Sequence, residues 1–163
     1  MSHYKQGNYR PINFSKCLNS SPQYLSGWEL QCFSKLDMND RVIKWGANSF
    51  SISYYNEVKR RVCKYFLDIY CEYLKPDNSI VKFIIEVKPD NQLLPPSKPK
   101  RLTSKSQKNY NFNLLQWKTN QNKWNAANQF GLANNMHFII RTDKGLYTFN
   151  NNQLTKISNK GFF

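Results

Sequence analysis

Acidic residues are scarce in this chain, which has 10 of them against 24 lysines and arginines among 163 residues. The resulting net charge of +14 favours binding to polyanions, because a lysine-rich surface gains affinity when phosphates release their counterions. Nucleic acid is the natural candidate. The shortage is also local, since no carboxylate precedes Glu29 and none lies between Asp90 and Asp143. Each of the few acids therefore calls for its own explanation.

Long apolar runs and paired cysteines are also absent. No segment approaches the roughly 20 apolar residues of a membrane span, and the opening MSHYKQGNYR lacks the apolar core of a signal peptide. The four cysteines form no CxxC pair and have no histidine cluster nearby, which argues against a zinc site or a redox motif. We therefore expect free thiols, no membrane partner, and a soluble protein of a reducing compartment.

The length predicts one domain with a real core. We interpret the polar, proline-broken residues 1–22 as a basic N-terminal arm, 23–150 as the domain, and 151–163 as a loose tail. Helical spacing of apolar residues predicts helices over 24–37 and 105–132. Alternating or β-branched runs predict strands over 41–46, 49–55, 62–74, 79–88, 136–141 and 145–149. This order predicts an α/β fold with a central mixed sheet flanked by helices.

Two acids lie on strands that are predicted to pair as a hairpin. Asp68 sits inside the apolar run KYFLDIYCEY, where burying a lone charge is costly, and Glu86 lies near the end of the partner run IIEVK. Register permitting, the two carboxylates lie side by side, and adjacent carboxylates repel unless a cation lies between them. A hard divalent ion such as Mg²⁺, or Mn²⁺, meets that requirement with oxygen ligands.

Lys88 shares a strand face with Glu86, because residues two apart point to the same side. It can orient or help deprotonate an attacking water, or neutralise charge on a phosphate in the transition state. Glu29 falls on the apolar stripe of the first predicted helix, so it needs a buried partner, and the metal site would supply one.

Each of these features has a plain structural alternative. Glu86 and Lys88 can form a solvated pair on an exposed sheet face, which contributes under about 1 kcal/mol. Asp68 can pair with a lysine at a sheet edge, and Glu29 can cap its own helix. The joint occurrence of the four residues in this order favours the active-site interpretation.

Several segments together resemble a known family. LDIYCEY followed by IIEVK is similar to the PD-(D/E)xK nuclease core. The segments SGWELQCF, VIKWGANSFSISYY, FIIEVKPDNQ and TNQNKWNAA resemble the head completion nucleases of tailed phages, a family itself similar to the TnsA-type endonuclease domain. The resemblance covers roughly residues 4–138, and it implies a restriction-endonuclease-like core.

The resemblance also implies an activity. It implies a Mg²⁺-dependent DNA endonuclease or end-trimming phosphodiesterase that acts in phage head completion after packaging, with capsid or portal proteins as partners. Such an enzyme would act in the host cytoplasm or in association with the virion. The alternative is a non-catalytic DNA-binding protein with the same fold, which plugs or stabilises the filled capsid. Metal binding that depends on Asp68 distinguishes the two.

The family's motifs assign roles to particular residues. They assign metal binding to Glu29, Asp68, Glu86 and the backbone carbonyl of Val87. They also imply that Lys88 assists the attacking water.

The later NQxKW segment adds Gln121 and Lys123 as supporting residues beside the phosphate. Two departures stand out. Leu67 replaces the proline that commonly precedes the aspartate, and Ala47 and Asn48 stand where an acid often follows the WG segment.

Basic residues of the carboxylate-free region are candidate DNA contacts. They are Lys98, Lys100, Arg101, Lys105 and Lys123. No helix-turn-helix or zinc finger is visible, which argues against sequence-specific action.

Overall fold

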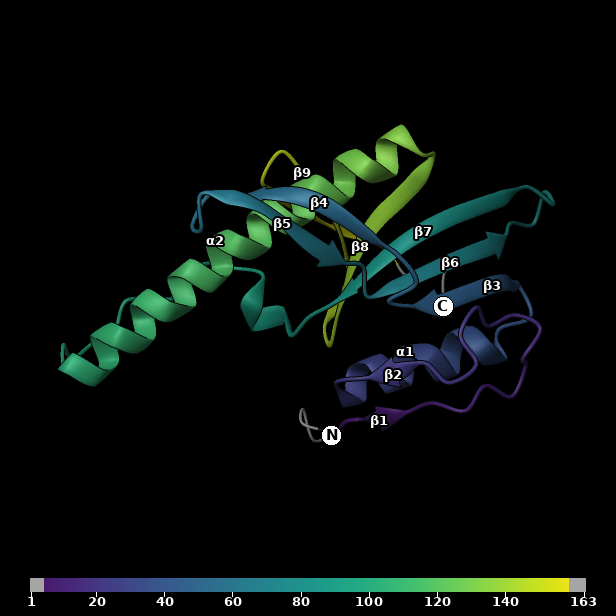
Figure 1. Cartoon of the computed structure of the whole chain (residues 1–163), viewed down its shortest axis with the longest axis horizontal. Helices are drawn as coiled ribbons and strands as arrows, with labels where there is room; N and C mark the ends of the chain where they lie inside the picture. The colour runs from purple at the N-terminus through teal and green to yellow at the C-terminus, as the bar shows by residue number, and fades with distance from the viewer. Residues whose placement is uncertain (1–4, 159–163) are drawn as a thin grey trace.

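A six-stranded mixed sheet lies at the centre of the structure, a computed structural model that describes residues 5–158 (Figure 1). Its strands are β3 (Val42–Ala47), β6 (Ile69–Leu74), β7 (Ile80–Val87), β8 (Met136–Thr142), β9 (Gly145–Asn150) and β10 (Gln153–Ile157). The spatial order is β10-β9-β8-β7-β6-β3, and only β7 and β8 are parallel. The predicted α/β fold with a mixed central sheet is therefore confirmed.

Two α-helices cover the sheet, one on each face. α1 (Gly27–Met38) packs near β3, while α2 (Ser104–Ala133) connects the parallel strands β7 and β8, which require a long crossover. A short 3-10 helix, η1 (Asp90–Gln92), follows β7. Both α-helices agree with the sequence prediction to within a few residues.

The alternation of side chains along β7 separates two apolar cores. Ile85 and Val87 join the core beneath α1, whereas Ile84 faces the core that contains Trp124 of α2. Glu86, next in the alternation, therefore points to the α2 side of the sheet. This placement decides which elements can contact it.

The strand predicted over 62–74 is in fact two strands that belong to different sheets. β5 (Arg61–Phe66) pairs with β4 (Ser51–Asn56) in a separate two-stranded ribbon that packs on α2, and β6 begins only at Ile69. The chain crosses between the sheets at Leu67 and Asp68. A continuous run of β-branched and aromatic residues cannot reveal such a break, because both halves have strand-like composition and the choice of partner strand is not local.

The described part of the predicted arm, residues 5–22, packs against the domain. β1 (Gly7–Asn8) pairs with β2 (Gln23–Tyr24), and the buried Asp37 of α1 holds the segment between them. Its carboxylate accepts hydrogen bonds from the Tyr9 hydroxyl at 2.9 Å and from the backbone N–H groups of Ile12 at 2.7 Å and Asn13 at 3.2 Å. One buried acid thus fixes a segment with no regular pattern of its own.

The prediction of a loose C-terminal tail over 151–163 is wrong for its first half. Residues 153–157 form β10, which pairs antiparallel with β9 along five residues. Leu154 and Ile157 are partly buried and pack against the two cores. The polar composition of the segment does not indicate these apolar contacts. The last part of the predicted tail, 159–163, lies outside the described residues, as do residues 1–4 of the predicted arm.

The four cysteines are free thiols, as predicted. Cys32 and Cys71 are buried, and burial raises the pKa of Cys32 to about 11 and that of Cys71 to about 12, so both thiols stay protonated at neutral pH. Among residues 5–158, no helix is both long enough and apolar enough to span a bilayer.

The anchoring role of Asp37 gives the first prediction. We expect Asp37→Ala to lower the free energy of unfolding by about 3 kcal/mol, because three partly buried donors lose the buried carboxylate that accepts their hydrogen bonds. Asp37→Asn keeps one oxygen and should lose less. Urea denaturation measures both, with the exposed Asp40→Asn as the control for loss of a charge. Equal stability of Asp37→Ala and wild type would show that the segment is held by other contacts.

Candidate active site

Glu86 is a buried carboxylate whose two oxygens both have a partner. Its side chain is 2% exposed, Oε2 accepts a hydrogen bond from the Tyr65 hydroxyl of β5, and Oε1 lies 3.0 Å from Nζ of Lys88. The Lys88 side chain is 26% exposed. The pair is therefore not the solvated ion pair of an exposed sheet face, because the acid is buried and the lysine is only partly exposed.

Asp68 lies beside Glu86, as the sequence predicted. Ile69 pairs with Ile85, so continuing the antiparallel register places Asp68 opposite Glu86. Its Oδ2 accepts a hydrogen bond from the Val87 N–H at 2.9 Å. Burial, and next the negative charge of Glu86, raise the pKa of Asp68 well above its usual range, although Lys88 partly offsets the effect.

Two neighbours of Glu86 keep their protons. The charge of Glu86 raises the pKa of Lys88, and burial, reinforced by Glu86, raises the pKa of Tyr65. Lys88 is thus a fixed cation and Tyr65 a fixed hydrogen-bond donor at neutral pH. This favours charge neutralisation by Lys88 over deprotonation of a water.

Lys123 approaches the same group of residues from α2. Its Nζ lies 5.3 Å from the centroid of the Tyr65 ring, in a cation–π contact, and its side chain lines a groove together with Lys88. Gln121 does not line that groove, although Asn120 of the same helical turn does. Of the two residues suggested by the NQxKW segment, Lys123 thus lies near the carboxylates, and the role of Gln121 stays a prediction.

Glu29 caps its own helix. Its Oε2 accepts from the Leu25 N–H at 2.9 Å, its Oε1 accepts from the Ser26 hydroxyl at 3.1 Å, and the Ser26 Oγ accepts from the Glu29 N–H. Glu29 nevertheless lines the same cleft of about 610 Å³ as Lys88 and Val87, and its charge contributes to the raised pKa of Lys88. It therefore lies at the rim of the site and not on the buried helix face.

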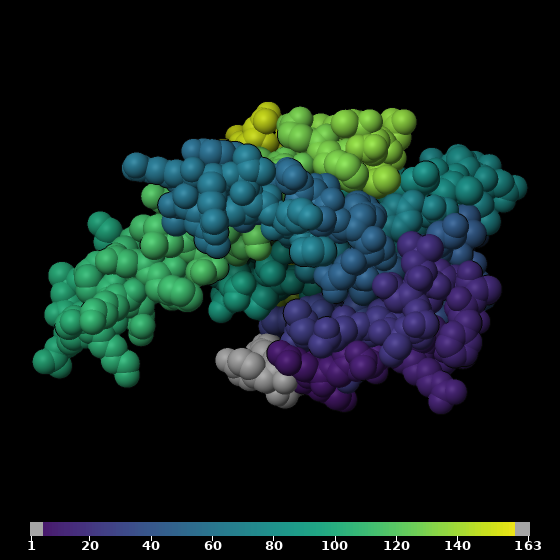
Figure 2. Space-filling view, viewed as in Figure 1, coloured from purple at the N-terminus to yellow at the C-terminus, as the bar shows by residue number. Residues whose placement is uncertain are grey.

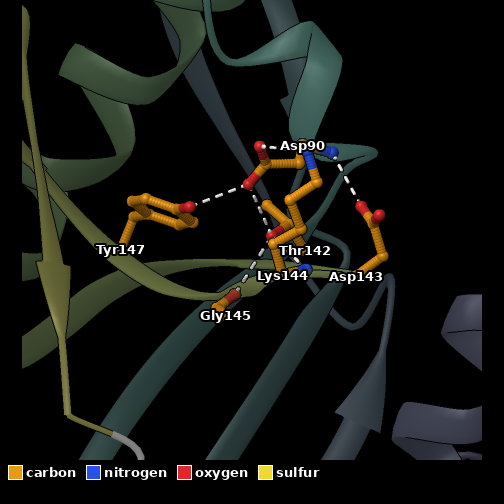
Figure 3. A network of polar contacts seen from close by, with 6 residues as sticks. All are labelled: Asp90, Thr142, Asp143, Lys144, Gly145 and Tyr147. Atoms are coloured by element: carbon orange, nitrogen blue, oxygen red, sulfur yellow. Dashed lines mark hydrogen bonds and ion pairs between the residues drawn. The ribbon is translucent and has the colours of Figure 1, made fainter.

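The loop after β7 is tied to the β8–β9 turn, which holds the segment next to Lys88 in place (Figure 3). The Asp90 carboxylate accepts from the hydroxyls of Tyr147 at 2.8 Å and Thr142 at 3.1 Å, and its backbone N–H donates to Asp143 at 2.9 Å. The hydrogen bond from Tyr147 contributes most to lowering the pKa of Asp90. Lys144 adds an ion pair at 3.6 Å.

The donor set fits a hard divalent cation. Asp68 and Glu86 offer adjacent oxygens, and the pKa of Asp68 is raised by burial and next by the charge of Glu86, both of which a cation between the carboxylates would offset. Val87 follows Glu86 as the last residue of β7, and its role as a backbone ligand stays a prediction. Within residues 5–158, no group of three or more histidine, cysteine or acidic side chains is close enough to hold a metal, so Glu29 does not complete a three-acid cluster here.

Sequence reasoning missed Tyr65 and the Asp90 network. Tyr65 is one aromatic residue among many in its run, and it reaches Glu86 only because the ribbon folds over the α2 face of the sheet. Tyr65 lies two residues after Cys63, so both side chains point to the inward face of β5. No sequence pattern, however, identifies Glu86 as the hydrogen-bond partner of Tyr65. Asp90 is the last acid before the carboxylate-free region, and this position is the one feature of the sequence that sets it apart.

The candidate DNA contacts lie mostly at one end of the molecule. Figure 2 shows the first half of α2 as a lobe at the left that extends beyond the rest of the protein. The exposed basic residues of this lobe and of the loop before it include Lys98, Lys100, Arg101, Lys105 and Lys108. The helix N-terminus adds partial positive charge at the same end.

Two comparisons relate the chain to known nucleases. The family model for the TnsA-like endonuclease N-terminal domain matches residues 39–143, which include Asp68, Glu86 and Lys88. The head completion nuclease of Enterobacteria phage T4 is 33% identical over 142 residues, and the match covers 86% of this chain and 92% of that relative. No solved structure matches.

The raised pKa of Asp68 gives a prediction about stability. Between the ordinary aspartate pKa of 3.8 and the higher folded value, the unfolded chain releases this proton more readily, so the group destabilises the fold at neutral pH. We expect Asp68→Asn to raise the free energy of unfolding in metal-free buffer at pH 7 by on the order of 1 kcal/mol.

The gain should disappear at pH 3, where both states of wild type hold the proton. Urea denaturation at the two pH values measures it, with the exposed Glu57→Gln as the matched loss of one charge. A loss of stability at pH 7 in Asp68→Asn alone would contradict the assignment of an unfavourable buried charge.

Proposed function

The chain belongs to the TnsA-like endonuclease family, and on that premise we propose that it is a divalent-metal-dependent nuclease that hydrolyses phosphodiester bonds in DNA. The observation that carries the proposal is that Asp68 lies opposite the buried Glu86. One oxygen of Glu86, Oε1, contacts the ammonium group of Lys88. A protein that only bound DNA would gain nothing from a costly pair of adjacent carboxylates.

Asp68 and Glu86 would hold the metal, with the Val87 carbonyl as a further ligand and Glu29 at the rim through a water. When bound, a divalent ion supplies Lewis-acid polarisation of the phosphate and lowers the pKa of a bound water. This chain's own residues then have separate tasks. Tyr65 and Lys88 fix the orientation of Glu86, since each contacts one of its oxygens.

Lys88 also acts on the substrate. Its side chain is partly exposed and lines two clefts, and its ammonium group stays protonated because Glu86 raises its pKa. It neutralises the negative charge that builds on the phosphate oxygens while water attacks phosphorus and the bond to the leaving deoxyribose oxygen breaks. The attached loop around Asp90 keeps this ammonium group at the mouth of the cleft.

The basic lobe supports DNA as the substrate. Its lysines and arginine lie in a stretch with no carboxylate, so a phosphate backbone meets attraction along its whole length. Gln121 is assigned a supporting role on α2, one residue from the groove-lining Asn120.

The biological setting of this activity follows from the T4 relative, whose name places it in head completion. We infer the same setting for this chain: cleavage or trimming of packaged DNA in the infected cell, beside capsid or portal proteins. In that role the enzyme would hydrolyse phosphodiester bonds in DNA that protrudes from a filled head.

The test is cleavage of linear and supercoiled DNA with Mg²⁺ or Mn²⁺, and with EDTA as the metal-free arm. We expect Glu86→Gln and Lys88→Ala to lower the rate by 100-fold or more, roughly the loss seen when one group that stabilises transition-state charge is removed. Lys82→Ala is the control, because Lys82 lies on the same strand away from the carboxylates.

Metal binding gives a second measurement that does not need turnover. Mn²⁺ should raise the melting temperature of wild type and have no effect on Asp68→Asn, since a ligand that binds only the folded state stabilises it. DNA binding without cleavage, together with no Mn²⁺ effect on wild type, would instead support the non-catalytic protein that plugs the filled capsid.

A further inference from the structure

We propose that the groove between α2 and the loop after η1 binds unpaired nucleotides next to the phosphodiester bond that is cleaved. The proposal rests on the proposed function, because Lys88 marks where the reacting phosphate would lie. The groove begins at Lys88 and Lys123, has a volume of about 600 Å³, and lies between the loop and the side of α2 that carries Phe112 and Trp117.

The size and shape of the groove favour a single strand. Its volume lies within the range of about 300–1,000 Å³ that is usual for pockets that enclose small ligands. A double helix is read by protein elements that project into its grooves, whereas this surface is hollow. A few unpaired nucleotides fit such a hollow, and a duplex does not.

Amide side chains supply most of the polar lining. They are Asn91, Gln92, Asn113, Gln116 and Asn120. An amide offers a donor and an acceptor side by side, which matches the edge of a base better than it matches a phosphate. Base edges on the pairing side are accessible only in unpaired nucleotides, so this lining favours a single strand.

Two aromatic residues supply stacking surfaces beside these amides. Phe112 is 62% exposed, although it gains nothing from contact with water. Trp117 is oriented, because its indole N–H donates to the Leu93 carbonyl at 3.3 Å and Leu93 is buried. A base can therefore stack on the Trp117 ring, which the fold holds in place, and the exposed Phe112 ring offers a second surface.

The distribution of charge fits a nucleic acid better than a protein partner. The groove has no carboxylate in its lining, and its two ammonium groups lie beside the site of cleavage. Seven of the eleven lining residues are amides or lysines, and the other four are Leu94, Pro96, Phe112 and Trp117. Protein partners usually cover a surface that is more uniformly apolar. The enzyme would accordingly prefer DNA with an overhang, a flap or a frayed end.

Fluorescence anisotropy with the full chain in EDTA tests this without turnover. The probes are a labelled blunt duplex and the same duplex with an unpaired overhang at either end. We expect wild type to bind the overhang DNA more tightly, and Phe112→Ala to lose about 5- to 100-fold of that affinity with little change for the blunt duplex.

Leu115→Ala is the matched control, because Leu115 is an exposed apolar residue of the same helix that does not line the groove. It should bind both DNAs as wild type does. Equal affinity of wild type for the two DNAs, or an unchanged Phe112→Ala, would overturn the groove assignment. Metal-dependent cleavage that Glu86→Gln abolishes would still support the proposed function in that case, so the two failures are distinguishable.

Two further outcomes complete the test. Unpaired oligonucleotides should quench tryptophan fluorescence in wild type and much less in Trp117→Phe, and equal quenching in both would overturn the stacking role. Sedimentation equilibrium without DNA should show no association through this surface. A wild-type dimer that Phe112→Ala dissociates would identify a second copy of the chain as the occupant and overturn the proposal.

Discussion

The buried carboxylate of Glu86 imposes the requirement that organises this molecule. A charge at that depth is tolerated only if each oxygen has a donor, and the two donors come from different sheets: Tyr65 from the ribbon and Lys88 from the end of β7. The ribbon must therefore fold over the α2 face of the central sheet. Lys123, above the Tyr65 ring, then joins α2 to the same arrangement.

Much of this could be predicted from the sequence. The hairpin of β6 and β7 follows from two apolar runs around a PDN turn, and its register brings Asp68 and Glu86 together. The period of two explains why Lys88 meets Glu86, and the spacing of apolar residues gives both helices. These features depend on local patterns, which a single sequence records directly.

Other features depend on contacts between distant segments. The break at Leu67 and Asp68 depends on which sheet each half joins, and the polar segment that becomes β10 depends on the free edge of β9. The spacing correctly predicts the helix that carries Glu29, but the Glu29 carboxylate accepts a hydrogen bond from Ser26 at the start of that helix. Spacing alone does not decide whether a carboxylate binds such a local partner or a distant one. The contact between Tyr65 and Glu86 likewise depends on which sheet β5 joins, so the sequence does not predict it.

The separation of the two sheets has a consequence for dynamics. A two-stranded ribbon carries fewer contacts than the six-stranded sheet, and such units often open on their own at a free energy below that of global unfolding. Opening of the ribbon would withdraw Tyr65 and expose Glu86 to water while β6, β7 and β8 stay paired. The lifetime of the Tyr65–Glu86 contact is then limited by the ribbon, although the pairing of Asp68 with Glu86 depends on the more stable central sheet.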